Sequence, residues 1–138
     1  MRIAAAVEYA GQEFSGWQKQ PGIRTIQGEI EKAIFSITKE NINTTAAGRT
    51  DAGVHALGQI IHFDTNLKRP MHSWVKGINA FLPISIRIKW AVDVSVDFHA
   101  RFSAKQREYQ YLLLNQSINS AIMSHYCGWT FYKLHIDL

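Results

Sequence analysis

The chain has 138 residues, which is within the size range of one globular domain. Its 46% hydrophobic and 19% charged residues exclude a disordered chain, and a net charge of +4 without a run of basic residues permits an RNA partner but does not require one. The single cysteine, Cys127, excludes an internal disulfide, and no 18 apolar residues follow one another, so we expect a cytoplasmic protein with no membrane association.

The first elements are read from the spacing of apolar residues. Residues 2–9 alternate, which predicts a strand with one buried face. The stretch 10–24 is rich in glycine and predicts a long loop, in which Trp17 needs a packing partner. Thr25 belongs to a residue type that caps helices, and apolar residues at helical spacing follow it, so we expect a helix over residues 25–38.

Five further elements are predicted along the rest of the chain. Pro70 suits a first helical turn, and Pro83 ends the apolar stripe that follows it. The elements are a short strand over 42–47, a strand over 58–64, a helix from Pro70 to about Leu82, a strand over 86–94 and a last strand over 107–114.

The order of these elements predicts an α+β fold of the split βαβ, or ferredoxin-like, type. In this plan two helices cover one face of an antiparallel sheet and leave the other face for a ligand. Because we find no internal repeat, low-complexity tract or linker, we expect a single domain over residues 1–138.

The segment GRTDAGVHA, residues 48–56, lies between the two predicted middle strands and contains the candidate catalytic residues. Glycines on both sides of Asp51 allow a sharp turn that exposes the carboxylate, and Arg49 would keep that carboxylate ionised if held beside it. An ionised carboxylate can act as a nucleophile or a general base. By spacing alone, an aspartate in a glycine-bounded loop such as Asp51 is usually a turn or helix-capping residue, and a histidine such as His55 is more often structural than a ligand. The scattered histidines predict no metal site.

A resemblance favours the catalytic interpretation. The segment GRTDAGVHALGQIIHFDT is similar to the catalytic motif of the TruA family of tRNA pseudouridine synthases. VEYAGQEFSGWQKQP, TIQGEIEKAI, INAFLP, FHARFSA and REYQY resemble further segments of that family in the same order, so the likeness covers about residues 1–115. Several motifs in the right order are far more specific than any one of them.

The resemblance implies roles for individual residues. Asp51 would be the catalytic aspartate that attacks the nucleoside and lets the uracil detach, rotate and rejoin through carbon, without a cofactor. Arg49 would fill the helix space that the flipped uridine leaves. Tyr109 would pack near the uracil, and His55 is a further candidate for substrate binding. From the residues alone, Arg49 could form a surface ion pair and Tyr109 could be a core aromatic that shares a strand face with Tyr111.

The expected substrate is the anticodon stem-loop of tRNA, held by a homodimer, as the resemblance implies. Phosphate contacts would come from basic residues near the loop and the open sheet face. The candidates are Lys19, Arg24, Arg101, Lys105 and Arg107. Nothing here resembles the second half of the family, which supplies an arginine partner for the aspartate. We therefore expect a truncated, N-terminal half with little activity alone, with a naturally short protein as the alternative.

Two other functions fit the predicted fold. One is a non-catalytic RNA-binding module, because split βαβ sheets with exposed aromatic residues bind RNA, although the Gly-Phe-Gly-Phe-Val type of signature is absent. The other is an interaction domain that uses the open sheet face for assembly, because a fold alone does not fix function.

Overall fold

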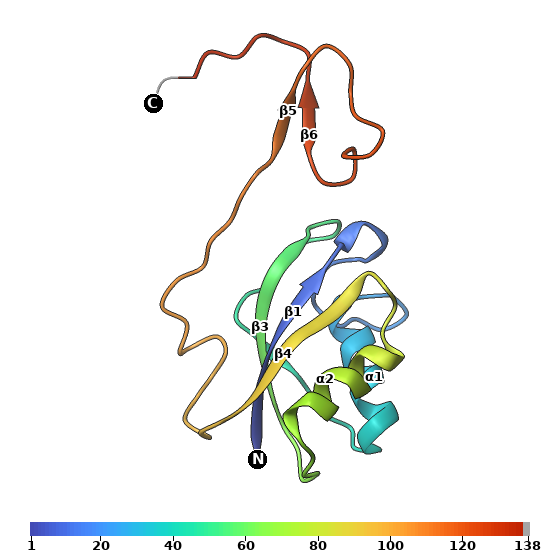
Figure 1. The fold of residues 1–138 in the computed structure, drawn as a ribbon, viewed down its shortest axis with the longest axis vertical. Helices are drawn as coiled ribbons and strands as arrows, with labels where there is room; N and C mark the ends of the chain where they lie inside the picture. Colours follow the sequence, from blue (N-terminus) through green and yellow to red (C-terminus); the bar gives the residue numbers. More distant parts are fainter. Residues whose placement is uncertain (137–138) are drawn as a thin grey trace. The chain divides into compact units, whose positions relative to one another are not determined.

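The strand predicted at the start of the chain lies at the centre of a four-stranded sheet in the computed structural model, which describes residues 1–136. Strand β1 (Arg2–Tyr9) pairs with β3 (Ala56–Asp64) on one side and with β4 (Ile86–Val94) on the other. The short β2 (Thr45–Ala46) pairs with β3, so the strand order is β2-β3-β1-β4 and every pair is antiparallel (Figure 1). This order confirms the predicted split βαβ architecture.

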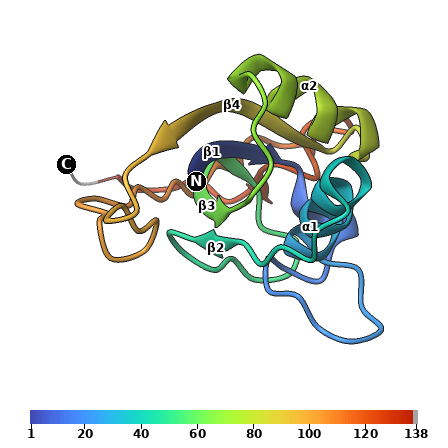
Figure 2. The ribbon, with the colours of Figure 1, turned by 90° about the horizontal axis from the view of Figure 1, so that it is seen from below.

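Two helices cover one face of this sheet (Figure 2). Helix α1 (Ile26–Thr38) begins after Thr25, whose hydroxyl accepts a hydrogen bond of 3.1 Å from the backbone nitrogen of Gly28, so the predicted cap is confirmed. Helix α2 (Met71–Phe81) begins one residue later than predicted, because Pro70 is its N-cap residue rather than part of its first turn. A short 3-10 helix, η1 (Gly11–Glu13), follows β1.

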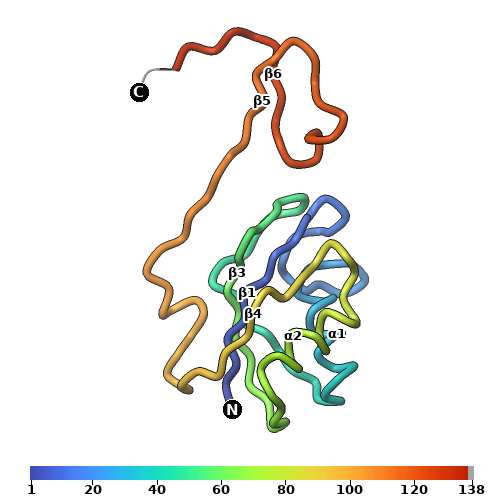
Figure 3. The backbone as a smooth tube through the Cα atoms, viewed as in Figure 1, coloured from blue at the N-terminus to red at the C-terminus, as the bar shows by residue number. Residues whose placement is uncertain are grey.

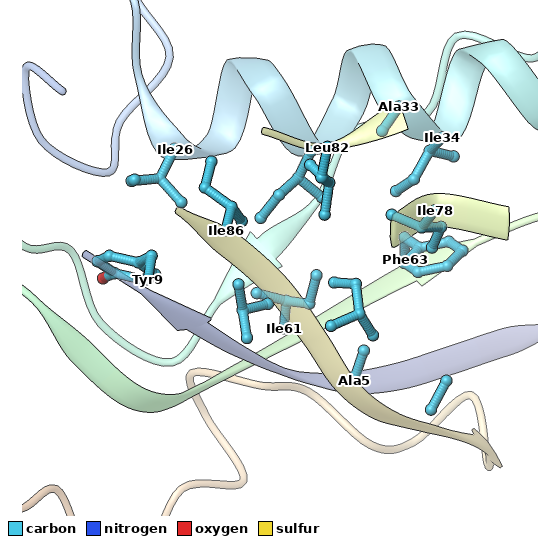
Figure 4. Close-up of a cluster of buried hydrophobic side chains, with 14 of the residues drawn as sticks. Ala5, Tyr9, Ile26, Ala33, Ile34, Ile61, Phe63, Ile78, Leu82 and Ile86 are labelled. Carbon is cyan, nitrogen blue, oxygen red and sulfur yellow. The ribbon is translucent and has the colours of Figure 1, made fainter. Parts of the chain in front are cut away.

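The core lies between the helices and the sheet (Figure 4). Ile26, Ile34, Ile61 and Ile78 are buried there, and burial stabilises the fold by roughly 1.5–3 kcal/mol for each such side chain. The prediction of a single buried face on β1 was wrong, because Ala4 and Ala6 on the opposite face are also buried. Their cross-strand neighbours include His62 and Trp90, which are large enough to shield a methyl group from water.

The chain divides into two compact units, Met1–Lys105 and Gln106–Leu138. The first unit alone forms the split βαβ sheet. Figure 3 traces the chain from β4 to the second unit, in which β5 (Leu113–Asn115) pairs in parallel with β6 (Gly128–Thr130). None of the helices in residues 1–136 has the length and apolar character needed to cross a bilayer.

Two predicted strands were wrong in extent. Residues 107–112 lie outside any strand, so Tyr109 and Tyr111 do not share a strand face. Alternation does not make a strand unless another backbone supplies hydrogen bonds, and β6 does so over three residues only.

The strand predicted over 42–47 is reduced to Thr45–Ala46, because the backbone nitrogen of Thr44 donates to the buried Glu31 carboxylate (2.8 Å) instead of to a neighbouring strand.

Candidate active site

Asp51 lies in the loop 47–55 that joins β2 to β3. Its backbone carbonyl accepts a hydrogen bond of 3.1 Å from the nitrogen of Val54, and Gly53 has a positive φ of 81° inside this turn. The Asp51 side chain is exposed. Within residues 1–136 its carboxylate makes no hydrogen bond or ion pair, so it neither caps a helix nor forms part of the core.

The base of the loop is fastened to β3. The backbone nitrogen of Ala47 donates to the carbonyl of Ile60 (2.8 Å). The side-chain amide of Gln59 bonds the backbone of Gly48 twice, by accepting from its nitrogen and donating to its carbonyl. These bonds fix the point at which the loop leaves the sheet.

A second loop, residues 10–17, supports the middle of the Asp51 loop. The backbone nitrogen of the buried Trp17 donates to the carbonyl of Thr50 (3.0 Å), and the Tyr9 hydroxyl lies 2.8 Å from the Thr50 hydroxyl. Gly11 lies so close to Val54 that a Cβ at Gly11 would overlap the Val54 carbonyl. Asp51 therefore has an exposed carboxylate on a loop that is held at its base by β3 and at its middle by the loop 10–17.

His55 belongs to this support. Its Nδ1 accepts a hydrogen bond of 2.8 Å from the backbone nitrogen of Gly11, so this ring nitrogen carries no proton. The imidazole thus joins the two loops to each other. Arg49 is exposed, and no ion pair joins it to Asp51 or to any other acid among the described residues. The close pairing of Arg49 with Asp51 that the spacing suggested is therefore not formed; both groups stay solvated instead.

Residues 5–103 match the protein family described as tRNA pseudouridine synthase. This chain belongs to that family. It is 48% identical to the tRNA pseudouridine synthase A of Herminiimonas arsenicoxydans, over 98% of this chain and 50% of the relative. It is 47% identical to the enzyme of the same name from Nitrosomonas eutropha, over 99% of this chain and 50% of the relative. The chain is also 49% identical to the tRNA pseudouridine synthase A of Bordetella avium, over 98% of this chain and 51% of the relative. The chain spans about half the length of the curated relatives that it matches.

The other predicted site residues of this family member lie in different places. Tyr109 and Arg107 belong to the second unit, where Tyr109 is exposed, whereas Asp51, Arg49 and His55 share one loop of the first unit. Lys105 is the last residue of the first unit and is exposed. Their roles in RNA binding stay predictions.

Two of the predicted phosphate-binding residues have carboxylate partners. The Nζ of Lys19 lies 3.2 Å from the buried Glu31 carboxylate. The Arg24 guanidinium lies 3.3 Å from Glu29 and 3.9 Å from Glu13. Part of the charge of both basic residues is thus compensated within the protein, which weakens their attraction for phosphate.

Arg101 lies on a segment that packs against the open face of the sheet. The Arg2 guanidinium donates to the carbonyls of Val96 (2.9 Å) and Phe98 (2.6 Å), and the backbone nitrogen of Ala100 donates to Nδ1 of His62 (3.0 Å). These contacts lie toward the Arg2 end of β1, whereas the Asp51 loop is fastened at the Tyr9 end.

Burial is the main cause that lowers the pKa of His62 below 6.5. Electrostatic interactions with Arg2 and His99 act in the same direction, whereas Asp64 opposes them. The neutral ring suits its place, because Nδ1 must be unprotonated to accept the Ala100 bond.

The sequence pointed to Asp51 but not to the residues that hold its loop, namely Tyr9, Gly11, Gly16, Thr50 and Gln59. Of the residues that support the loop, the sequence indicated only Trp17, because a large aromatic residue in a glycine-rich loop needs a packing partner. Its ring is buried and lies 5.9 Å from the ring of Tyr9. In the described residues no group of three or more His, Cys, Asp or Glu side chains is arranged to hold a metal ion.

Proposed function

We propose that this chain carries the nucleophile of a tRNA pseudouridine synthase, and that Asp51 is that nucleophile. The observation that supports this most directly is an exposed carboxylate, without a partner in residues 1–136, on a loop fastened to β3 and to the loop 10–17. A nucleophile needs both accessibility and a fixed position.

The proposed reaction is an isomerisation of uridine. The Asp51 carboxylate attacks C1′ of the ribose as the bond between C1′ and N1 of uracil breaks, and the freed uracil rotates. C5 of the uracil then displaces the carboxylate, so the bond between Asp51 and C1′ breaks as the bond between C1′ and C5 forms. The proton on C5 leaves and N1 gains one, so the atoms and electrons balance without a redox cofactor. A uridine inside a helix must first leave the base stack, and we propose Arg49 to fill the vacated space.

We propose the anticodon stem-loop of tRNA as the substrate, held by a homodimer. The choice of tRNA rests on the family membership, because the relatives are named tRNA pseudouridine synthase A. The anticodon stem-loop and the homodimer rest only on the resemblance of the sequence motifs. Arg101, Lys105 and Arg107 remain candidate phosphate contacts. Tyr109 remains the candidate for packing against the uracil.

We expect slow turnover from these 138 residues alone. Among the described residues the Asp51 carboxylate has no cationic partner, and the resemblance implies that the second half of the family supplies an arginine for it. Joining the chain to the second half of the Herminiimonas arsenicoxydans relative should raise the rate. Equal rates with and without that half would contradict this expectation.

The test follows release of tritium from carbon 5 of uracil in tRNA transcripts, with the chain alone and with the fusion just described. Asp51→Asn should lower the rate by more than about 10³-fold while tRNA binding persists. Asp93→Asn, an exposed aspartate on β4, is the matched control and should keep the wild-type rate. Turnover that survives Asp51→Asn would remove Asp51 from the mechanism, and tRNA binding without any turnover would favour the RNA-binding module.

A further inference from the structure

A pair of hydroxyl groups joins the end of β1 to the residue before Asp51. The Tyr9 hydroxyl at the end of β1 is 2.8 Å from the hydroxyl of Thr50, the residue before Asp51. The Tyr9 side chain is buried and packs against Trp17, so its hydroxyl has a fixed position. Two residues 41 positions apart in the chain are thereby joined next to the candidate nucleophile.

The backbone of Thr50 is held independently. Its carbonyl accepts the hydrogen bond of 3.0 Å from the nitrogen of Trp17. The Trp17 carbonyl in turn accepts from the nitrogen of Gln27 (3.0 Å), in the first turn of α1. Thr50 is therefore tied by its side chain to β1 and by its backbone, through Trp17, to α1.

The position of Asp51 follows from these two ties. A peptide group is planar, so the Cα of Thr50, its carbonyl and the nitrogen and Cα of Asp51 lie in one plane. The hydrogen bond from Trp17 fixes the Thr50 carbonyl in that plane. The hydrogen bond with Tyr9 fixes the Thr50 side chain, which is attached to the Cα of Thr50. With both bonds in place the Cα of Asp51 has little freedom.

We propose that the Tyr9–Thr50 hydroxyl pair positions the Asp51 carboxylate for attack, which makes Tyr9 and Thr50 positioning residues. The inference rests on the proposed role of Asp51. Loss of either hydroxyl frees the Thr50 side chain, the Asp51 Cα moves, and a displacement of about 1 Å at a reacting group costs about 10²-fold in rate.

The experiment compares Tyr9→Phe, Thr50→Val, Thr50→Ser and the double variant of Tyr9→Phe with Thr50→Val. The readout is the single-turnover rate at saturating tRNA, in the chain alone and in the fusion, together with the Kd for tRNA and the melting temperature. Tyr9→Phe and Thr50→Val should each lower the rate by about 10- to 100-fold with the Kd unchanged. The double variant should be no slower than the slower single one, because the Tyr9–Thr50 bond is lost in every case. Thr50→Ser keeps the hydroxyl and should stay near the wild-type rate.

Thr65→Val is the control for loss of a buried hydroxyl. The Thr65 hydroxyl donates to Glu40 (3.1 Å), and its backbone nitrogen bonds the carbonyl of Met1, at the other end of β1 from Tyr9. It should lower the melting temperature without slowing turnover. The inference is overturned if Tyr9→Phe slows turnover no more than Thr65→Val does, or if Thr50→Ser is as slow as Thr50→Val. If those results appear while Asp51→Asn abolishes turnover, the proposed function stands. If turnover survives Asp51→Asn, both fail.

Discussion

Gly16 and Thr50 approach each other so closely that a Cβ on Gly16 would lie 2.9 Å from the Thr50 carbonyl oxygen. Gly16 also has a positive φ of 87°, which L side chains rarely adopt. The residue before Asp51 thus packs against a position where the chain tolerates only glycine.

Gly16→Ala should destabilise the fold more than Gly22→Ala does. Both glycines have a positive φ, which costs about 1–2 kcal/mol for alanine, but a Cβ on Gly22 would meet nothing within 4 Å. Gly16→Ala adds the collision with Thr50. The free energy of unfolding from urea titration measures the difference, and equal losses would show that the loops separate without cost.

Gly53→Ala should slow turnover, although it destabilises the fold no more than Gly22→Ala does. Gly53 has a φ of 81° and open space around its Cβ position, so its loss of stability should match that of Gly22→Ala. Because Gly53 lies in the turn between Asp51 and Val54, only this variant should also slow turnover. Gly53→Asn should recover much of the rate, since asparagine tolerates the left-handed region. Equal turnover in Gly53→Ala and Gly22→Ala would contradict the prediction.

Glu31→Ala should destabilise the protein by about 1–3 kcal/mol, because it leaves buried polar groups without a partner. One oxygen of the buried Glu31 carboxylate accepts from both the backbone nitrogen and the hydroxyl of Thr44, at 2.8 and 3.2 Å. Glu29→Ala on the same helix is the control. Its ion pair with the half-exposed Arg24 should contribute less than about 1 kcal/mol. Urea unfolding that gives equal losses would show that Thr44 finds other partners.

Acid should destabilise the fold through His62. Because its pKa is lowered in the folded state, the unfolded chain takes up a proton first as the pH falls below 6.5, and stability decreases from there toward the folded pKa. Above pH 6.5 both states are neutral and this contribution to the pH dependence vanishes. His62→Gln should remove that part of the acid-side loss, measured as melting temperature against pH. His72→Gln, an exposed histidine of α2, should retain it.

The elements with a clear local pattern could be predicted from the sequence. The bounds of β1 and β4 agree with the predicted 2–9 and 86–94, and α1 begins at its Thr25 cap. The spacing of apolar residues and helix capping depend on residues a few positions apart, so both can be predicted from the sequence without the tertiary structure. The same holds for the motif that contains Asp51, because its glycines and carboxylate are neighbours in the chain.

What the tertiary structure decided is the environment of those elements. The short β2, the burial of Glu31 and the limits of β5 all depend on which distant backbone or side chain arrives as a partner. The support of the Asp51 loop is of the same kind, since Tyr9 and Thr50 meet only after β1 and β3 have paired. Sequence alone placed a carboxylate at position 51, whereas its fixed and exposed position comes from contacts between segments about forty residues apart.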